Sequence, residues 1–241
     1  MHPSRLRMTA LWCCCFWTMY TALAADTAPP LQNFSADYEI SSGQLKVGTL
    51  RRKLVIDAEQ HYRFESNVEA SGLLAMLHRG QIEESSVGTL TAGQVRPLTY
   101  RYRKRSGKKQ KETNIEFDWA AGRITTTAQG QRWQMAPAAG VLDKLVYQLA
   151  LMQDLAHAAP DLRYLVADGG RTKTYEVARQ GEETLQILGQ AEPTLKVAYL
   201  QQGTSRRTVF WCAPRYRFLP VQIEYRDDDS RVTKATLVRY Q

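Results

Sequence analysis

Alternation of apolar and polar residues runs through most of this chain, and it limits the possible folds more than any other feature. Short stretches place apolar or β-branched residues at every second position, and turn-forming pairs such as Ser42-Gly43, Ala92-Gly93 and Ala121-Gly122 separate them. Side chains along a β-strand point to opposite faces in turn, so this period is typical of strands with one packed face and one wet face. The chain is therefore expected to be mainly β, with hairpins joining its strands into an antiparallel sheet.

One segment has a different period. Between residues 141 and 155 the apolar residues recur at spacings of three and four, which predicts one amphipathic helix. A sheet built from all the alternating stretches is too large to stay flat, so we expect it to curl around this helix into an open or closed barrel. The expected strands are 34–40, 44–56, 62–70, 81–90, 98–103, 113–119, 123–128, 163–167, 172–179, 183–188, 195–200, 208–212, 219–225 and 232–240.

The first 24 residues have the pattern of a secretory signal peptide. Two arginines precede an apolar stretch from Met8 to Tyr20, and small residues up to Ala24 suit signal peptidase. We expect cleavage near Ala24, a flexible lead over residues 25–33 and a single β-rich domain over residues 34–241. The alternative is an uncleaved anchor, although the apolar stretch is short for a bilayer about 30 Å thick.

Cysteine use and composition agree with an exported globular domain that has no disulfide. Three of the four cysteines fall within the expected signal, so only Cys212 remains in the mature chain and no intramolecular bridge can form. Apolar residues make up 44% of the chain and charged residues 23%, which is ordinary for a chain that buries a sizeable core.

A search for catalytic motifs finds no constellation. The mature chain has His61, His78 and His157, and none stands at metal-ligand spacing from another. A nucleophile elbow, a phosphate loop and a dinucleotide fingerprint are also missing from the sequence. We therefore expect a protein that is not an enzyme, with no catalytic residues, no cofactor and no metal site.

The densest charge feature is a basic run between residues 96 and 111, with Ser106-Gly107 marking a turn within it. In an exported protein such a projecting cluster favours phospholipid headgroups or another anionic envelope surface, and makes nucleic acid an unlikely partner. The alternative is a solubilising hairpin with no partner. The candidate residues for an anionic surface are Arg101, Arg103, Lys104, Arg105, Lys108, Lys109 and Lys111.

Several short motifs follow one another along nearly the whole mature chain. They are Phe34-Ser-Ala-Asp-Tyr38, Gly43-Gln-Leu-Lys-Val-Gly48, Glu83-Glu-Ser85, Arg96-Pro-Leu-Thr-Tyr100, Phe117-Asp-Trp119, Asp143-Lys-Leu-Val-Tyr-Gln-Leu149, Val166-Ala-Asp-Gly169, Trp211-Cys-Ala-Pro214 and Leu219-Pro-Val221. Their order resembles the bacterial family catalogued as domain of unknown function 3108. The resemblance implies export in bacteria, and hence the periplasm, together with a β-rich domain. It implies no activity and no catalytic residues.

These observations favour a non-catalytic envelope protein that binds an apolar or lipidic ligand in the curved sheet. The candidate ligand contacts are Tyr100, Trp119, Trp133 and Trp211, and for each of them the alternative is core packing. The alternative function is a protein-interaction or assembly factor of the cell envelope that takes no small-molecule ligand. An enclosed apolar cavity would favour the first hypothesis, and a dry, packed interior would favour the second.

Overall fold

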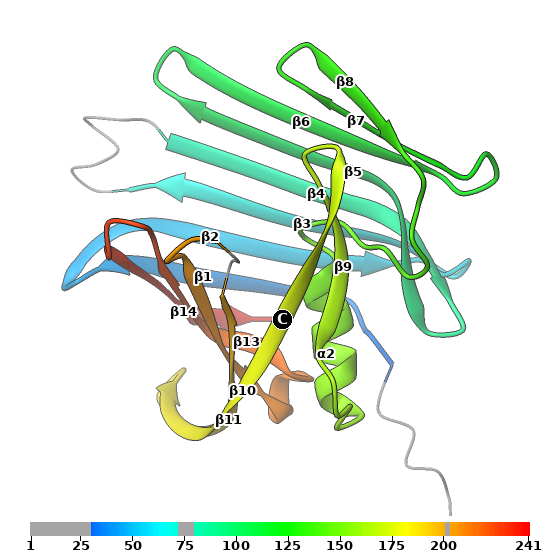
Figure 1. Cartoon of the computed structure of the whole chain (residues 1–241). Coiled ribbons are helices and arrows are strands. Elements are labelled where there is room, and N and C mark those ends of the chain that lie inside the picture. The colour runs from blue at the N-terminus through cyan, green and yellow to red at the C-terminus, as the bar shows by residue number, and fades with distance from the viewer. Residues whose placement is uncertain (1–29, 72–79, 201–202) are drawn as a thin grey trace, which may run out of the picture.

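Fourteen strands in one antiparallel sheet make up most of the chain in the computed structural model, which describes residues 30–71, 80–200 and 203–241 (Figure 1). One α-helix, α2 (Tyr147–Ala156), and one turn of 3-10 helix, η1 (Pro214–Tyr216), accompany the strands within these residues. The strands are β1 (Phe34–Ser42), β2 (Leu45–Ile56), β3 (His61–Ala70), β4 (Gly80–Thr91), β5 (Gln94–Ser106), β6 (Lys109–Asp118), β7 (Arg123–Ala128), β8 (Gln131–Met135), β9 (Arg163–Asp168), β10 (Arg171–Ile187), β11 (Gln190–Leu200), β12 (Arg207–Ala213), β13 (Leu219–Arg226) and β14 (Val232–Tyr240).

Strand order follows chain order except at one seam. The sheet runs β8-β7-β6-β5-β4-β3-β2-β1-β14-β13-β12-β11-β10-β9, so β1 and β14 join two sets of sequential neighbours. Beyond the last paired strand residue, Ser35 and Gln241 exchange backbone hydrogen bonds of 2.8 and 2.9 Å. The two ends of the described chain therefore lie side by side in the middle of the sheet.

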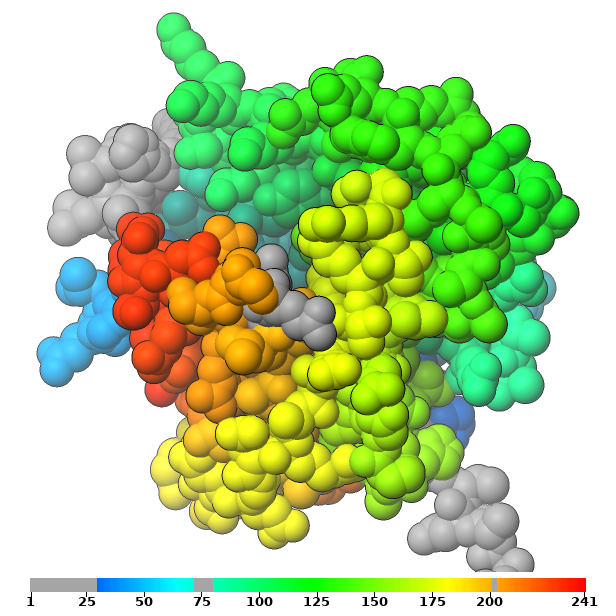
Figure 2. Space-filling model, viewed as in Figure 1, coloured from blue at the N-terminus to red at the C-terminus, as the bar shows by residue number. Residues whose placement is uncertain are grey.

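The sheet curls until its two edge strands approach one another, but it does not close. The turn between β9 and β10 packs against β8, because a Cβ atom added at Gly170 would lie 2.7 Å from Trp133 Cβ. Thr172 Oγ1 also lies 3.9 Å from Met135 Sδ. In Figure 2 the yellow β9–β10 hairpin adjoins the green region that holds β7 and β8. The expected barrel is thus an open one.

Helix α2 packs inside the curve and supplies much of the core. Its buried residues include Leu149, Leu151 and Met152, and they belong to one large cluster with aromatic side chains such as Phe64 and Phe210 from both halves of the sheet. We call the face of the sheet that turns toward α2 the inner face. Burial of this apolar surface is the main force that keeps the sheet curled around the helix.

The helix is shorter at its start than the expected range of 141–155. The backbone of Leu142 is instead hydrogen-bonded to the edge strand β9, with Leu142 N–H donating to Leu165 and Ala167 N–H donating to Leu142, both at 2.8 Å. This parallel bridge holds residue 142 in an extended path, so the helix cannot begin until the chain has turned away from β9. Among the described residues no helix is long and apolar enough to span a membrane.

Candidate functional site

The inner face of the sheet becomes steadily more accessible toward the end that carries the β5–β6 turn. Along β5, Tyr100 is buried, Tyr102 is half-buried and Lys104 is exposed. The same gradient runs along β6 from Ile115 to Lys111. It also appears along β3 and β4, which pass from buried to half-buried side chains in that direction. The interior is therefore sealed by α2 at one end and approached by solvent at the other.

One row of polar side chains crosses the inner face where this gradient begins. Cross-strand pairing sets Arg52 on β2 opposite Ser66 on β3, Ser66 opposite Glu84 on β4, and Glu84 opposite Tyr102 on β5. Directly opposed residues in an antiparallel sheet point to the same face, so the four side chains share the inner face. The row separates an apolar region against α2 from the accessible end.

Arg52 is the unusual member of the row. Its side chain is only 7% exposed, its Nε is buried without a hydrogen-bond partner among the described residues, and it makes no ion pair with any of them. Its Cζ lies 5.9 Å from the centre of the Tyr38 ring. Buried charges in proteins are ordinarily paired, because an ion removed from water loses its solvation.

Glu84 is engaged by a tyrosine instead of by Arg52. The Tyr100 hydroxyl donates to Glu84 Oε1 at 2.7 Å. Burial raises the pKa of Glu84, while the Tyr100 hydrogen bond and the charges of Lys144 and Arg52 partly offset that rise. The positive charge of Arg52 therefore lowers the pKa of Glu84 somewhat, although the two side chains form no ion pair.

Asp143 fixes the segment that leads into α2 to the inner face of β4. Its Oδ1 accepts the backbone N–H groups of Leu145 and Val146 at 2.8 Å, and its Oδ2 accepts the Ser86 hydroxyl at 2.5 Å. Because Ser86 has one proton and gives it to Asp143, the Tyr62 hydroxyl 3.1 Å away donates to Ser86. Burial raises the pKa of Asp143 to about 6. Each polar side chain of this network has a hydrogen-bond partner, which supports a structural role for Asp143.

The aromatic ligand candidates lie in different parts of the molecule. Tyr100 is buried on the inner face and donates to Glu84, a member of the polar row. Trp119 stacks on Phe117 and donates to the Pro97 carbonyl at 2.8 Å. Trp133 packs on Gly170 where the sheet edges meet.

Trp211 lies in a small second cluster with Ala198 and Val209, and donates to Glu183 at 2.9 Å. The structure therefore does not gather Tyr100, Trp119, Trp133 and Trp211 into one pocket. Of the four, Tyr100 alone contacts the polar row of the inner face.

The basic residues form the exposed hairpin of β5 and β6, but they divide between its two faces. Arg101, Arg103 and Arg105 alternate with buried Tyr100 and so face outward. Arg103 is paired with Glu112 at 2.9 Å and with Glu83 at 3.4 Å on that face. Lys104 and Lys111 are paired across the two strands and face inward at the accessible end. Lys108 and Lys109 lie at the turn, and all four lysines are exposed.

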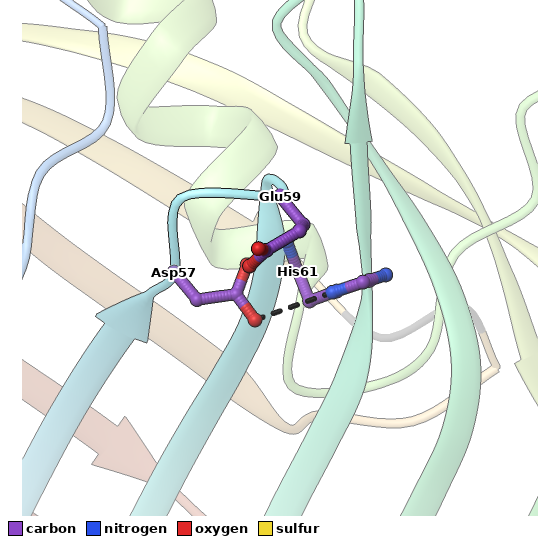
Figure 3. Close-up of side chains that lie close together, drawn as sticks. All are labelled: Asp57, Glu59 and His61. Atoms are coloured by element: carbon purple, nitrogen blue, oxygen red, sulfur yellow. Dashed lines mark hydrogen bonds and ion pairs between the residues drawn. The ribbon is translucent and has the colours of Figure 1, made fainter.

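Asp57, Glu59 and His61 bring three polar side chains together at the β2–β3 turn (Figure 3). Their potential ligand atoms lie within 4.8 Å of one another, and all three residues are exposed. Asp57 Oδ1 accepts the His61 backbone N–H at 2.8 Å, and its Oδ2 lies 3.2 Å from His61 Nδ1. The contacts between Asp57 and His61 close the hairpin turn, in which Gln60 has a φ of 64°.

Three grooves of about 550, 660 and 600 Å³ lie on the outer face of the sheet. The first is lined by outward-facing side chains of both charges, among them Glu65, Glu83, Arg101, Arg103 and Glu112. None of the three is the enclosed apolar cavity that the ligand hypothesis would favour.

Sequence reasoning missed Arg52, although its signal was present. In the alternating stretch of β2, Leu50, Arg52 and Leu54 occupy successive positions of one parity, so a cation stands where an apolar residue is expected. Arg51 precedes it on the opposite face, so in the sequence the two arginines resemble an ordinary exposed basic pair.

Comparisons with known proteins agree with the fold. A crystal structure of a beta-barrel-like protein of domain of unknown function DUF1849 from Brucella abortus is similar, with a TM-score of 0.58 and 8% identity over 88% of this chain and 98% of that chain. At this identity the similarity shows the fold alone. No curated protein matches the chain. The profile of the family described as "Protein of unknown function (DUF3108)" matches residues 37–238, most of the chain, and the chain therefore belongs to the DUF3108 family.

Proposed function

We propose that the protein is exported to the periplasm and acts there as a non-catalytic envelope protein that binds an apolar or lipidic ligand within its curved sheet. The observation that carries this proposal is the graded inner face, which is accessible at one end and apolar beyond it. Concave surfaces and mouths of curved β-sheets are frequent ligand sites, because they enclose apolar groups while the strands fix the wall.

The lining of the accessible end suits an apolar chain. Val68 on β3 and Ile82 on β4 are paired across the sheet and half-buried, and Leu50 on β2 is paired with Val68. Tyr102 adds a half-buried aromatic side chain near them. Covering these side chains with a ligand would remove their apolar surface from water, which is worth about 25 cal/mol per Å².

Lipid analysis of protein purified from the periplasm tests this function. We expect organic extraction and mass spectrometry to find a co-purifying amphiphile with the parent and not with Val68→Glu, which places a charge on the inner face. Asn67→Glu adds the same charge to the neighbouring position of β3 on the outer face and should retain the amphiphile. Parent protein free of any such molecule, and unable to take one up from vesicles, would rule the function out.

A second candidate function is recognition of another envelope protein through the outer-face groove of about 550 Å³. Its mixed lining of glutamates and arginines is the observation that favours it, because complementary charge patterns select partners. Crosslinking in the periplasm distinguishes the two functions. A partner lost on Arg101→Glu and kept on Val68→Glu would support the groove as the working surface.

A further inference from the structure

No described residue accepts a hydrogen bond from the side chain of Arg52, whose Nε is buried. We propose that Arg52 binds the carboxylate of a single-chain amphiphile, such as a fatty acid, inside the curved sheet. This inference rests on the proposed function and specifies the headgroup of its ligand. A guanidinium presents its N–H donors in a planar fork that matches the two oxygens of a carboxylate. A bound carboxylate would supply the acceptor that Arg52 lacks within the described part of the chain.

Two hydroxyl groups beside Arg52 also make no hydrogen bond within the described part of the chain. Ser66 is paired with Arg52 across β2 and β3, is only 4% exposed, and makes no hydrogen bond with a described residue through its hydroxyl. Tyr147 at the start of α2 is 5% exposed, and its hydroxyl is unbonded within the same part of the chain. Arg52 is near enough to Tyr147 for its charge to oppose the rise that burial causes in the tyrosine pKa. The N–H groups of Arg52 and the hydroxyls of Ser66 and Tyr147 are thus available to hydrogen-bond the oxygens of a ligand.

Glu84 does not take the place of the missing acceptor. It lies two strands away from Arg52 in the polar row, and strands are spaced about 4.8 Å apart. Its carboxylate is held by Tyr100 at 2.7 Å, and Ser66 stands between it and Arg52. We assign the ligand carboxylate to the Arg52 guanidinium and the Ser66 hydroxyl, which are paired across β2 and β3.

The neighbouring acids favour a carboxylate over a phosphate monoester. Glu84 lies in the same row, and Asp143 is close enough to Glu84 for the two charges to interact. A second negative charge on the ligand would add repulsion, and a phosphate monoester carries about −1.5 to −2 at neutral pH. A single negative charge on the ligand matches the single positive charge of Arg52.

The residues next to the polar row favour an apolar tail on this carboxylate. The adjacent row toward the accessible end consists of Leu50, Val68 and Ile82, and then Lys104 and Lys111 on β5 and β6. A chain extending from Arg52 toward that end would cover Val68 and Ile82, which are half-buried. The two exposed lysines at the same end would attract an anionic amphiphile as it approaches.

Binding measurements on delipidated mature protein test the inference. Laurate, 1-dodecanol and acetate are titrated into the parent, Arg52→Gln, Arg52→Lys and Arg51→Gln by calorimetry. We expect Arg52→Gln to weaken laurate binding about 10- to 100-fold, the range given by charge-assisted hydrogen bonds, and to leave dodecanol binding unchanged. Arg52→Lys should recover part of the loss. Arg51→Gln removes the neighbouring cation, whose side chain faces outward and pairs with Asp37, and should bind as the parent does.

The outcomes separate this inference from the function on which it rests. Equal laurate affinity for the parent and a folded Arg52→Gln would overturn the role of Arg52 and leave the lipid-binding function standing. Failure of the parent to bind either laurate or dodecanol would overturn both. Acetate binding as tightly as laurate would support an anion site at Arg52 and overturn the apolar ligand. Should Arg52→Gln not fold, Ser66→Ala replaces it, with an expected selective loss for laurate over dodecanol.

Discussion

Asp143 shows how one buried carboxyl can serve as a structural anchor and still oppose folding near neutral pH. It accepts three hydrogen bonds, from Ser86 and from the backbone of Leu145 and Val146, and these favour its charged form. Burial outweighs them, so the pKa of the carboxyl rises from 3.8 to about 6. The folded protein therefore holds a proton on Asp143 between these two values, where the unfolded chain has released it.

We predict that the free energy of unfolding decreases as the pH rises from about 4 to about 6. The folded state binds more protons than the unfolded state in this window, so raising the pH favours unfolding. The decrease due to Asp143 is on the order of 2–3 kcal/mol for a shift from 3.8 to about 6. Urea unfolding at pH 4.5 and pH 7 measures it, and Asp143→Asn should make the difference smaller. The raised pKa of Glu84 leaves part of the pH dependence in place.

Asp161→Asn is the matched control for this prediction, because Asp161 is exposed and lies outside the hydrogen-bond network of Asp143. Its pH profile should follow that of the parent. An Asp143→Asn profile that also follows the parent would show that folding does not raise the pKa of Asp143.

At the scale of elements, the tip of the β5–β6 hairpin is exposed and carries several positive charges. Arg105, Lys108 and Lys109 form no ion pair among the described residues, unlike Arg103 lower on the same hairpin. Because strand alternation separates the other cations onto two faces, these residues near the turn are best placed to meet one anionic plane together.

Replacing Arg105, Lys108 and Lys109 with Gln should leave the melting temperature nearly unchanged and weaken binding to anionic vesicles. Each cation near such a surface contributes about 1 kcal/mol, so the loss at low salt should be roughly 10- to 100-fold. Co-sedimentation at low and high salt measures it. A control triple variant of Lys53, Arg63 and Arg132 to Gln removes the same charge from exposed positions elsewhere. Equal losses from the two variants would show that net charge matters and the hairpin does not.

The β9–β10 turn offers a test of the contact between the sheet edges. Gly169 and Gly170 both have positive φ, of 63° and 77°, so alanine at either position strains the backbone by about 1 kcal/mol. Only at Gly170 would the new Cβ also meet Trp133, at 2.7 Å, whereas nothing lies within 4 Å at Gly169. Gly170→Ala should therefore lower the free energy of unfolding by about 1–3 kcal/mol more than Gly169→Ala. Equal effects in urea unfolding would show that the edges are not packed together in solution.

Most strands could be predicted because hairpins leave a local signal, a period of two interrupted by turn residues. The exceptions have physical causes. β8 was not predicted because Gln131–Met135 is almost entirely exposed and has little alternation, and its pairing depends on β7. The expected strands 172–179 and 183–188 form one strand, β10, because the pairing register shifts between Arg179 and Gly181 without ending the strand. The start of α2 depends on the bridge from Leu142 to β9, a tertiary contact.

The interior site could be predicted only in part, for a similar reason. Tyr100 was a candidate because aromatic residues often line pockets, and the structure places it in contact with the polar row. Grouping Arg52, Ser66 and Glu84 required the registers of three strands, which the alternation within each strand leaves open.

At the scale of the whole molecule, the predicted signal peptide lies outside the described residues, and the first strand, β1, begins at Phe34. We predict that protein recovered from the periplasm starts at Ala25 or within two residues of it, which gives a mature chain of 241 − 24 = 217 residues. N-terminal sequencing and intact mass measurement check this. Recovery of the chain with Met1 intact from the membrane fraction would support the uncleaved anchor instead.

The seam between β1 and β14 has a consequence for how the chain folds. All other ladders of the described sheet join sequence neighbours, so they can form from short loops, while the seam must bring together the two ends of the domain. Contacts between distant parts of a chain slow folding, so this ladder is expected to form late. Adjacent ends also suit circular permutation. A chain joined from Gln241 to Phe34 and reopened between β8 and α2 would run from β9 through β14 and on through β1 to β8, an unbroken up-and-down meander with no distant pairing left to find.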